Sequence, residues 1–410
     1  MMTKKQRLLA AIRRQPVDRV PVAPATWQWM RKKCGACNWL LELELAREYD
    51  FDPIPHLCWF DGPPFHNNIR ILNGSYHTEG RAYGEDLSAG LSIDVQIERH
   101  EDCTIVRRRI QTPAGPLSDA VRQPLSLLDR DSECEETRAP GWRFPTHLER
   151  LLKEETDLEK IRFLLTQPTN GELNLIRRYI DVVGEEGLLA ADCLSPLDYL
   201  ANQVIANDEM LHLYSERRPF LEEIIQTFWE YGHQRLKSYL EAGLEMVNAV
   251  WYGCGPSAGW TVDAWRDLFL PLLKKDVELT HDHGALYLYN DHGRIMDLFP
   301  MLIEADVDVV QTLCPPPLGD ADLALAKAQY GSDICLRGWI DSIHILERGE
   351  PDAIASAVRQ AMDVAAPGSG FIIGTSQPIT AHTPERNLRA YFDACKTYGA
   401  GARESELTSA

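Results

Sequence analysis

An amide, a carboxylate and an imidazole follow one another in Asn290-Asp291-His292-Gly293, directly after a short apolar segment. Histidine changes charge closer to neutral pH than other side chains, so it suits proton transfer. Glycine permits a sharp backbone turn, which would leave the preceding side chains projecting from the end of the segment. We predict that His292 is the catalytic acid or base and that Asp291 assists it, although Asp291 could instead cap the next helix.

Comparable polar and aromatic residues follow the other apolar segments. We predict that amides position a small substrate through hydrogen bonds and that aromatic rings form apolar walls, a combination typical of ligand sites. The predicted substrate-binding residues are Asn248, Trp251, Tyr252, Asn290, Gln311, Trp339 and Gln377, and beside them stand Asp192, Ser195, Asp198, Cys314, Asp341, Thr375 and Ser376. Two alternatives stay open: the aromatic residues could be packing groups, and Asp192 and Asp341 could be helix caps.

Other histidines are weaker candidates. His66 or His77 could reach the site from an inserted segment. His281 and His283 lie late in a predicted helix, where a positive charge interacts favourably with the helix dipole, so we predict a structural role for both. His382 stands just before a predicted helix start and receives the same interpretation.

The apolar segments are the elements that must position these residues. Six of them alternate with helical stretches in the second half of the chain, at 187–192, 246–251, 285–290, 307–311, 334–339 and 370–375, and two more lie at 20–23 and 54–59. Continuous apolar runs of this length are typical of strands that are buried on both faces, as in a parallel sheet covered by helices. Eight strands alternating with helices predict an α/β fold of the TIM (β/α)8 type, in which chemistry occurs at the carboxyl ends of the strands.

The alternation is interrupted once. Residues 66–125 carry shorter alternating patterns and a turn signal, which predict an antiparallel β insertion over the barrel mouth. We predict one barrel domain over 1–400 that contains this insertion, followed by a flexible tail at 401–410. Asp208 is predicted to cap a long amphipathic helix that ends at Gly243.

Charge and composition exclude several classes of partner. The chain has 61 acidic and 42 basic residues and a net charge of −19, whereas a nucleic-acid partner requires a basic surface. The apolar stretches fall well short of the roughly 18 residues that a membrane span needs. Ten cysteines in a chain of this length do not form a dense disulfide framework, so we expect reduced thiols, including those of Cys34 and Cys37, and a cytoplasmic protein.

Four motifs in register resemble the uroporphyrinogen decarboxylase superfamily. They are the segments 16–21 (Pro-Val-Asp-Arg-Val-Pro), 292–308, 338–341 (Gly-Trp-Ile-Asp) and 383–388 (Thr-Pro-Glu-Arg-Asn-Leu). The resemblance covers nearly the whole chain and implies a TIM-type barrel. It also implies one of two activities, because the superfamily divides into porphyrinogen decarboxylases and corrinoid-linked methyltransferases.

The decarboxylase motifs are incomplete in this chain. Decarboxylases of the family hold the tetrapyrrole with Trp-x-Met-Arg-Gln-Ala-Gly-Arg-Tyr, and the matching segment 27–35 keeps only one of the two arginines, Arg31. We predict that Arg31 also binds the substrate. Their Gly-His-Gly-Ile motif is replaced by residues 376–379, where Gln377 stands in the place of the histidine. Uroporphyrinogen carries eight carboxylates and requires cationic donors, so we expect the decarboxylase activity to be absent and a small, mostly neutral or aromatic substrate to bind.

The methyltransferase motifs are incomplete as well. That branch of the family often binds zinc through a His-x-Cys motif and a later cysteine, and the matching positions are Asn290, His292 and Gln377. With neither cysteine present we predict no bound metal, while zinc on His292 with Asp291 or a distant cysteine is the alternative.

The resemblance and the site residues together predict a methyltransferase that moves a methyl group between a small substrate and a corrinoid, methylcobalamin. The Asp-x-His-x-x-Gly motif of corrinoid-binding domains does not occur in the sequence, so the corrinoid would come from a partner protein. A uroporphyrinogen decarboxylase or another small-carboxylate lyase is the alternative, and a non-catalytic ligand-binding barrel is the second. A homodimer is one assembly that these observations leave open.

Overall fold

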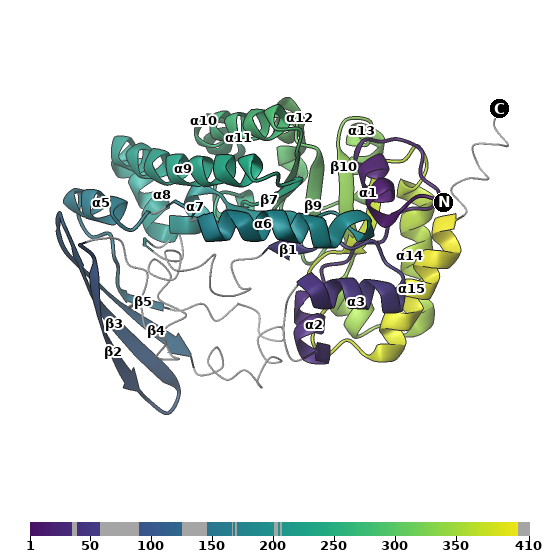
Figure 1. The fold of residues 1–410 in the computed structure, drawn as a ribbon, viewed down its shortest axis with the longest axis horizontal. Coiled ribbons are helices and arrows are strands. Elements are labelled where there is room, and N and C mark those ends of the chain that lie inside the picture. The colour runs from purple at the N-terminus through teal and green to yellow at the C-terminus, as the bar shows by residue number, and fades with distance from the viewer. Residues whose placement is uncertain are drawn as a thin grey trace. The chain divides into compact units, whose positions relative to one another are not determined.

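The computed structural model describes residues 1–34, 39–57, 90–124, 146–165, 167–168, 170–200, 204–205 and 207–400 (Figure 1). The chain groups into two compact units, one formed by 1–58, 174–193 and 239–410 and the other by 59–173 and 194–238. The single domain expected over 1–400 stays a prediction, and the tail at 401–410 lies outside the described residues.

The first unit contains a sheet of seven strands with parallel pairings, as the apolar segments predict. In sheet order the strands are β1 (His56–Leu57), β6 (Ala190–Leu194), β7 (Met246–Val250), β8 (Leu286–Asn290), β9 (Val309–Leu313), β10 (Cys335–Ile340) and β11 (Phe371–Thr375). Strands β7, β8 and β9 are buried along their whole length. The predicted α/β fold of the TIM type is confirmed.

The segment 20–23 forms the eighth member of the barrel. Val22 makes a parallel bridge to Ile373 of β11, and on its other side its carbonyl accepts a hydrogen bond from Asp52 N at 2.7 Å. The chain from Asp52 then leads into β1, which pairs with β6. These two members are shorter than the sequence predicts because prolines at positions 21, 53 and 55 have no N–H to donate to a neighbouring strand.

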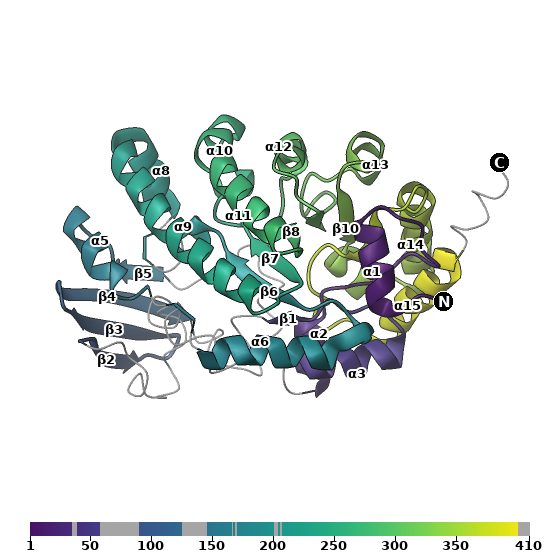
Figure 2. The same cartoon turned by 45° about the horizontal axis from the view of Figure 1, so that its top comes forward.

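Helices surround this sheet on its outer side, and α11, α12, α13 and α14 follow one another around it (Figure 2). Those of the first unit are α1 (Lys4–Ile12), α2 (Trp27–Cys34), α3 (Trp39–Tyr49), α10 (Val262–Leu268), α11 (Leu270–Asp282), α12 (Phe299–Glu304), α13 (Leu323–Tyr330), α14 (Pro351–Ala365) and α15 (Glu385–Gly399). Helix α6 (Asn170–Val183) and helix α9 (Arg218–Glu241) each run through a boundary between the units.

The amino end of the barrel is closed by α1. Its Leu8, Ala11 and Ile12 belong to one buried cluster with residues from the beginnings of the strands, among them Ile54, Leu188, Met246, Val309, Cys335 and Ile372. Thr3 and Gln6 form a capping box that fixes the start of the helix. The opposite, carboxyl end of the strands is therefore the end available to a ligand.

The second unit contains the antiparallel sheet that the sequence predicts. Its strands are β2 (Ser92–Arg99), β3 (Cys103–Thr112), β4 (Gly115–Pro124) and β5 (Thr146–Glu149), accompanied by α5 (Glu155–Arg162), α7 (Pro196–Leu200) and α8 (Asn207–Glu216). Strand β3 alternates buried and exposed side chains over most of its length, so one face of the sheet is packed. The prediction that this sheet covers the barrel mouth stays a prediction.

One helix differs from its prediction. The amphipathic stretch expected to run unbroken from Asp208 to Gly243 forms two helices, α8 and α9, which meet at Arg217. Pro219 explains the break, because its ring lacks the N–H that would continue the hydrogen bonds of α8.

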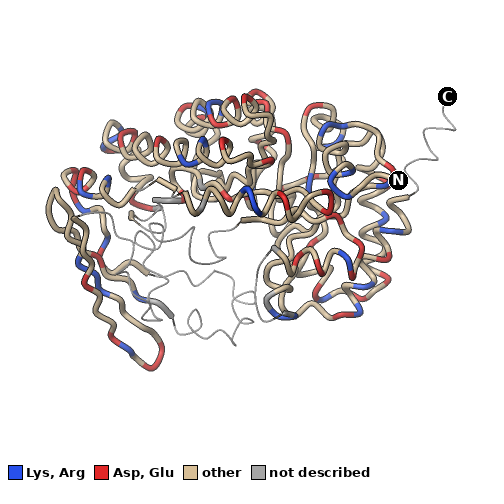
Figure 3. The backbone as a smooth tube through the Cα atoms, viewed as in Figure 1, with Lys and Arg blue, Asp and Glu red and all other residues tan. Residues whose placement is uncertain are grey.

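Acidic and basic residues are interspersed along the outer helices (Figure 3). Several are ion pairs between elements, such as Arg47 with Glu186 and Arg266 with Glu304. No helix within the described ranges is long and apolar enough to cross a membrane.

The hydrogen bonds between Val22 and Asp52, just before β1, allow a test of barrel closure. Asp52 is fully buried; its carboxylate accepts a hydrogen bond from Val22 N and pairs with Arg7 of α1. Burial raises the pKa of Asp52, against the opposing effects of Arg7 and Arg19. We expect Asp52→Asn to lower the free energy of unfolding by about 3 kcal/mol, because it leaves a buried guanidinium with weaker compensation.

The matched control is Asp50→Asn, which removes a half-exposed carboxylate paired with Arg19. It should cost less than about 1 kcal/mol, because water screens an exposed pair. Equilibrium denaturation in urea measures both variants, and equal losses would show that Asp52 does not hold the barrel closed.

Candidate active site

Side chains on alternate residues of each barrel strand point into the interior, and they form two layers. The buried apolar cluster described above fills the layer near α1. Nearer the carboxyl ends of the strands the interior residues are polar, one from each of six adjacent strands. We call this set the polar layer: His56, Asp192, Asn248, Asn290, Gln311 and Arg337.

One half of the polar layer is a hydrogen-bonded chain of amides ending on an acid. Asn290 Nδ2 donates to Asn248 Oδ1 at 3.2 Å, and Asn248 Nδ2 donates to Asp192 Oδ1 at 2.6 Å. His56 Nδ1 lies 3.2 Å from Asn248 Nδ2 and 3.4 Å from Asp192 Oδ1. Asn290 Oδ1 is buried and has no donor within hydrogen-bonding distance among the described residues. The predicted ligands Asn248 and Asn290 therefore lie together in the interior.

The other half of the polar layer is built on Arg337, which the sequence analysis missed. Its Nη1 donates to Gln311 Oε1, and its Nε and Nη2 both donate to Ala23 O at 3.2 Å. Burial lowers the pKa of Arg337 to about 10, which still leaves it charged at neutral pH. The sequence did contain a signal for Arg337, because a charged residue within the apolar run 334–339 is unusual. His56, within the apolar run 54–59, was a similar signal.

His292 lies just beyond β8 and is held by Thr312. Thr312 Oγ1 lies 2.8 Å from His292 Nδ1 and 3.0 Å from Asp291 O, which also accepts a hydrogen bond from Thr312 N at 3.1 Å. Burial lowers the pKa of His292 to about 4, and the ring of Tyr252 lies over the imidazole with centroids 4.3 Å apart and planes inclined by 33°. At neutral pH this side chain is therefore neutral, and one of its ring nitrogens has a lone pair that can accept a proton.

A buried thiol lies beside this histidine. Cys314 Sγ is 3.5 Å from Thr312 Oγ1 and donates to Ser376 O at 3.1 Å. Burial raises the pKa of Cys314, against hydrogen bonds that include one with Gln377, so the thiol is protonated at neutral pH. The structure thus brings Gln377, Cys314 and Tyr252 together around His292.

Asp291 and Trp251 lie on the outer face of the sheet, opposite to Asn290 and Val250. Asp291 Oδ1 accepts a hydrogen bond from His292 N at 2.7 Å, and Tyr289 OH donates to Oδ2 at 3.3 Å. Trp251 is buried, donates to Tyr287 OH at 3.2 Å and stacks on Tyr289. Because side chains alternate along a strand, these two residues support the turn that carries His292 rather than line the interior.

The other predicted residues are distributed more widely. Trp339 is half-buried at the end of β10 with φ +95, a conformation that is rare outside glycine and is often found at functional sites. Asp341 caps the π-helix Ser342–Glu347 and pairs with His344 Nδ1 at 2.8 Å. Ser195 donates to Asp198 in the second unit. The side chain of Arg31, and His66 and His77, lie outside the described residues.

No group of three or more His, Cys, Asp or Glu side chains is placed to hold a metal ion in the described part of the chain. The donors nearest to one another around His292 are one thiol and hydroxyl or amide groups, whereas a zinc site requires three or four nitrogen, sulfur or carboxylate ligands. The described site residues therefore do not fit zinc.

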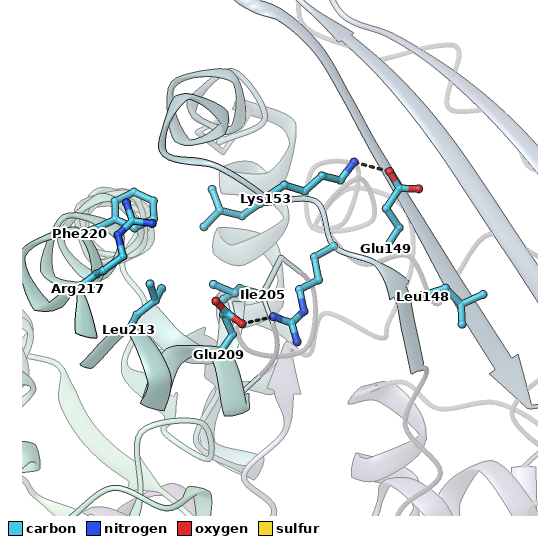
Figure 4. Close-up of a pocket in the computed structure, with 10 residues that line it drawn as sticks. Leu148, Glu149, Lys153, Ile205, Glu209, Leu213, Arg217 and Phe220 are labelled. Atoms are coloured by element: carbon cyan, nitrogen blue, oxygen red, sulfur yellow. Dashed lines mark hydrogen bonds and ion pairs between the residues drawn. The ribbon is translucent and has the colours of Figure 1, made fainter. Parts of the chain in front are cut away.

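A separate cavity of about 320 Å³ lies in the second unit (Figure 4). Its lining is Leu148, Glu149, Arg150, Leu152, Lys153, Ile205, Glu209, Leu213, Arg217 and Phe220. Arg150 pairs with Glu209 at 2.6 Å, Lys153 pairs with Glu149, and Arg217 pairs with Glu155. Each of its cations already has a carboxylate, and none of the predicted site residues lines it.

The fold resembles that of known enzymes. A methyltransferase from Methanosarcina mazei superposes with a TM-score of 0.60 at 14% sequence identity, over 97% of this chain and 99% of that one. A B12-independent methionine synthase from Shewanella sp. W3-18-1 gives a TM-score of 0.47 at 12% identity, over 96% and 100% of the two chains. The sequence matches no curated protein.

The sequence itself settles the family. Residues 145–398, more than half of the chain, match the family described as Uroporphyrinogen decarboxylase (URO-D). This range contains the motifs at 292–308, 338–341 and 383–388 on which the sequence analysis based its resemblance, and it spans strands β6 to β11 with the residues that surround His292. The chain belongs to the uroporphyrinogen decarboxylase (URO-D) family.

Proposed function

We propose that this protein is a methyltransferase that moves a methyl group between a small substrate and a corrinoid carried by a partner protein. The observation that carries the proposal is His292, an imidazole that is neutral at neutral pH and is held at the carboxyl end of β8 by the contact of its Nδ1 with Thr312 Oγ1 at 2.8 Å. The Methanosarcina mazei protein of similar fold is named a methyltransferase, and we extend that class of reaction to this chain.

The role of His292 follows from its protonation state. An oxygen, nitrogen or sulfur atom accepts a methyl group through an electron pair. Removing a proton from a hydroxyl or thiol acceptor makes that pair more nucleophilic, and removing one from an ammonium sets the pair free. A histidine with a pKa of about 4 is unprotonated at neutral pH and can take that proton on its unprotonated ring nitrogen. We therefore assign His292 as the general base for the direction in which the small molecule accepts the methyl group.

Other residues position the substrate. Tyr252, 37% exposed and stacked on His292, provides an aromatic wall next to the base. Gln377 stands beside Cys314, where its amide can also hydrogen-bond a ligand. The corrinoid would supply or accept the methyl group. No step is assigned to zinc, because the described residues do not provide its ligands.

The His292 assignment predicts a specific loss of activity. His292→Asn should lower turnover by about 10²–10⁴-fold, since it removes the proton acceptor but retains a polar side chain of similar reach. His344→Asn is the matched control, because His344 also follows a barrel strand but pairs with Asp341. We expect full turnover from that control and melting temperatures near the native value for both variants. A folded, fully active His292→Asn protein would remove the residue from the mechanism.

The lowered pKa of His292 also predicts a pH dependence of stability. In the unfolded chain this histidine takes up a proton near pH 6.5, whereas the folded protein resists protonation until about pH 4. Folding is therefore opposed progressively as pH falls from 6.5 to 4, by up to about 3 kcal/mol, and is unaffected above that window. Denaturation of the native protein and of His292→Asn at pH 7 and pH 4.5 measures the difference. The native protein should lose more stability than the variant on acidification, and parallel losses would contradict the assignment.

The choice between methyl transfer and decarboxylation can be tested directly. We expect methyl transfer only when a corrinoid is supplied, and no coproporphyrinogen from saturating uroporphyrinogen. The physical reason is the cost of placing eight carboxylates among described site residues that include few cations, since desolvating each unpaired carboxylate costs several kcal/mol. Chromatography of porphyrins and of methylated products measures both activities. Decarboxylation at an enzymatic rate would overturn the proposal in favour of the lyase alternative.

A further inference from the structure

Arg337 is a buried charge that the fold itself leaves incompletely paired. It is 3% exposed and keeps its positive charge at neutral pH. The buried carboxylate of Glu42 raises its pKa against the effect of burial, but no carboxylate lies within ion-pair distance of Arg337 among the described residues. Its protein partners are two neutral oxygens, Gln311 Oε1 and Ala23 O. A charged group out of water normally requires an opposite charge, and Arg108 of β3, which is equally buried, has Asp119 for this purpose.

Two of the five N–H groups of Arg337 have no hydrogen-bond acceptor among the described residues. Of its five N–H groups, two point at Ala23 O and one at Gln311, which leaves one on each terminal nitrogen. Two N–H groups on one guanidinium match the two oxygens of a carboxylate. Gly374 supports this arrangement, because a side chain there would begin 2.7 Å from Ala23 O, the oxygen that fixes the orientation of Arg337.

An acid lies across the barrel from this cation. With the segment 20–23 counted as the eighth member, β6 and β10 are four places apart in either direction around the ring, so they face each other. Asp192 on β6 and Arg337 on β10 are thus at opposite sides of the polar layer. Midway between them in the strand order is β8, which carries Asn290. Its Oδ1 is buried and has no hydrogen-bond donor among the described residues.

We propose that the polar layer binds a small zwitterionic substrate of the amino-acid type, with its carboxylate on Arg337 and its ammonium or other N–H donor directed to Asp192 and Asn290 Oδ1. This inference rests on the proposed function for the statement that the bound molecule gains or loses a methyl group. The binding itself is independent of any reaction. It replaces the expectation of a mostly neutral ligand, because Arg337 and Asp192 stand on facing strands of the polar layer.

Three probes separate the two ends of such a ligand. N-methylglycine carries both charges, N-methylglycinamide keeps the ammonium but replaces the carboxylate by an amide, and methoxyacetate carries the carboxylate alone. Calorimetric titration of the full chain at constant ionic strength should give the tightest binding for N-methylglycine. We expect the amide to bind about 10-fold to 100-fold more weakly, since it loses a charge-assisted pair with the guanidinium.

Variants then assign each end to its residue. Arg337→Met should reduce binding of N-methylglycine to the level of the amide, and Asp192→Asn should weaken N-methylglycine about tenfold while leaving methoxyacetate unchanged. Arg337→Met should keep or raise the melting temperature, because it removes an incompletely paired buried charge. Arg108→Met is the matched control: it breaks a buried pair in the second unit, so it should lower the melting temperature and leave N-methylglycine binding unchanged.

Two results would overturn the proposal. One is equal affinity of the native protein for N-methylglycine and its amide, which needs no variant. The other is a loss of stability in Arg337→Met as large as in Arg108→Met, which would make Arg337 structural. Failure of the proposed reaction is a different result, in which N-methylglycine binds through Arg337 but no methyl group passes to a supplied corrinoid.

Discussion

Every second side chain of each strand in the curled parallel sheet faces its interior. Near α1 this interior is filled by apolar side chains, which need no hydrogen-bond partners. Nearer the carboxyl ends the side chains are polar, and buried polar groups need hydrogen-bond partners. The chain from Asn290 through Asn248 to Asp192 follows from that requirement. So does the contact of Arg337 with the main-chain carbonyl of Ala23, in the segment 20–23 on the far side of β11.

Because side chains alternate along a strand, neighbouring residues at the end of β8 face opposite sides of the sheet. Asn290 faces the interior, and Asp291 faces the helices, where it accepts the main-chain N–H of His292. Thr312 contacts the imidazole from the next strand and holds its orientation. Groups on two strands therefore orient the His292 ring before any ligand binds. Residues that never touch a ligand can matter to the reaction in this way.

The chain belongs to the URO-D family, but the charges of its candidate site do not suit uroporphyrinogen, the substrate in the family's name. A tetrapyrrole with eight carboxylates calls for many cations, whereas the described interior has one guanidinium, which donates only to neutral oxygens. Asp192 stands on the facing strand. This arrangement suits a ligand with few charges better than a large polyanion.

The sequence by itself determined the parallel barrel, the antiparallel insertion and the place of His292 after a strand, because apolar periodicity and turn residues are local properties. It could not separate Asn290 from Asp291, since one residue of register decides which side chain faces the interior. Register also decides that Arg337, which lies within an apolar run, faces the interior. The lowered pKa of His292 depends on burial by residues distant in sequence, such as Tyr252 and Thr312, so only the tertiary structure could decide it.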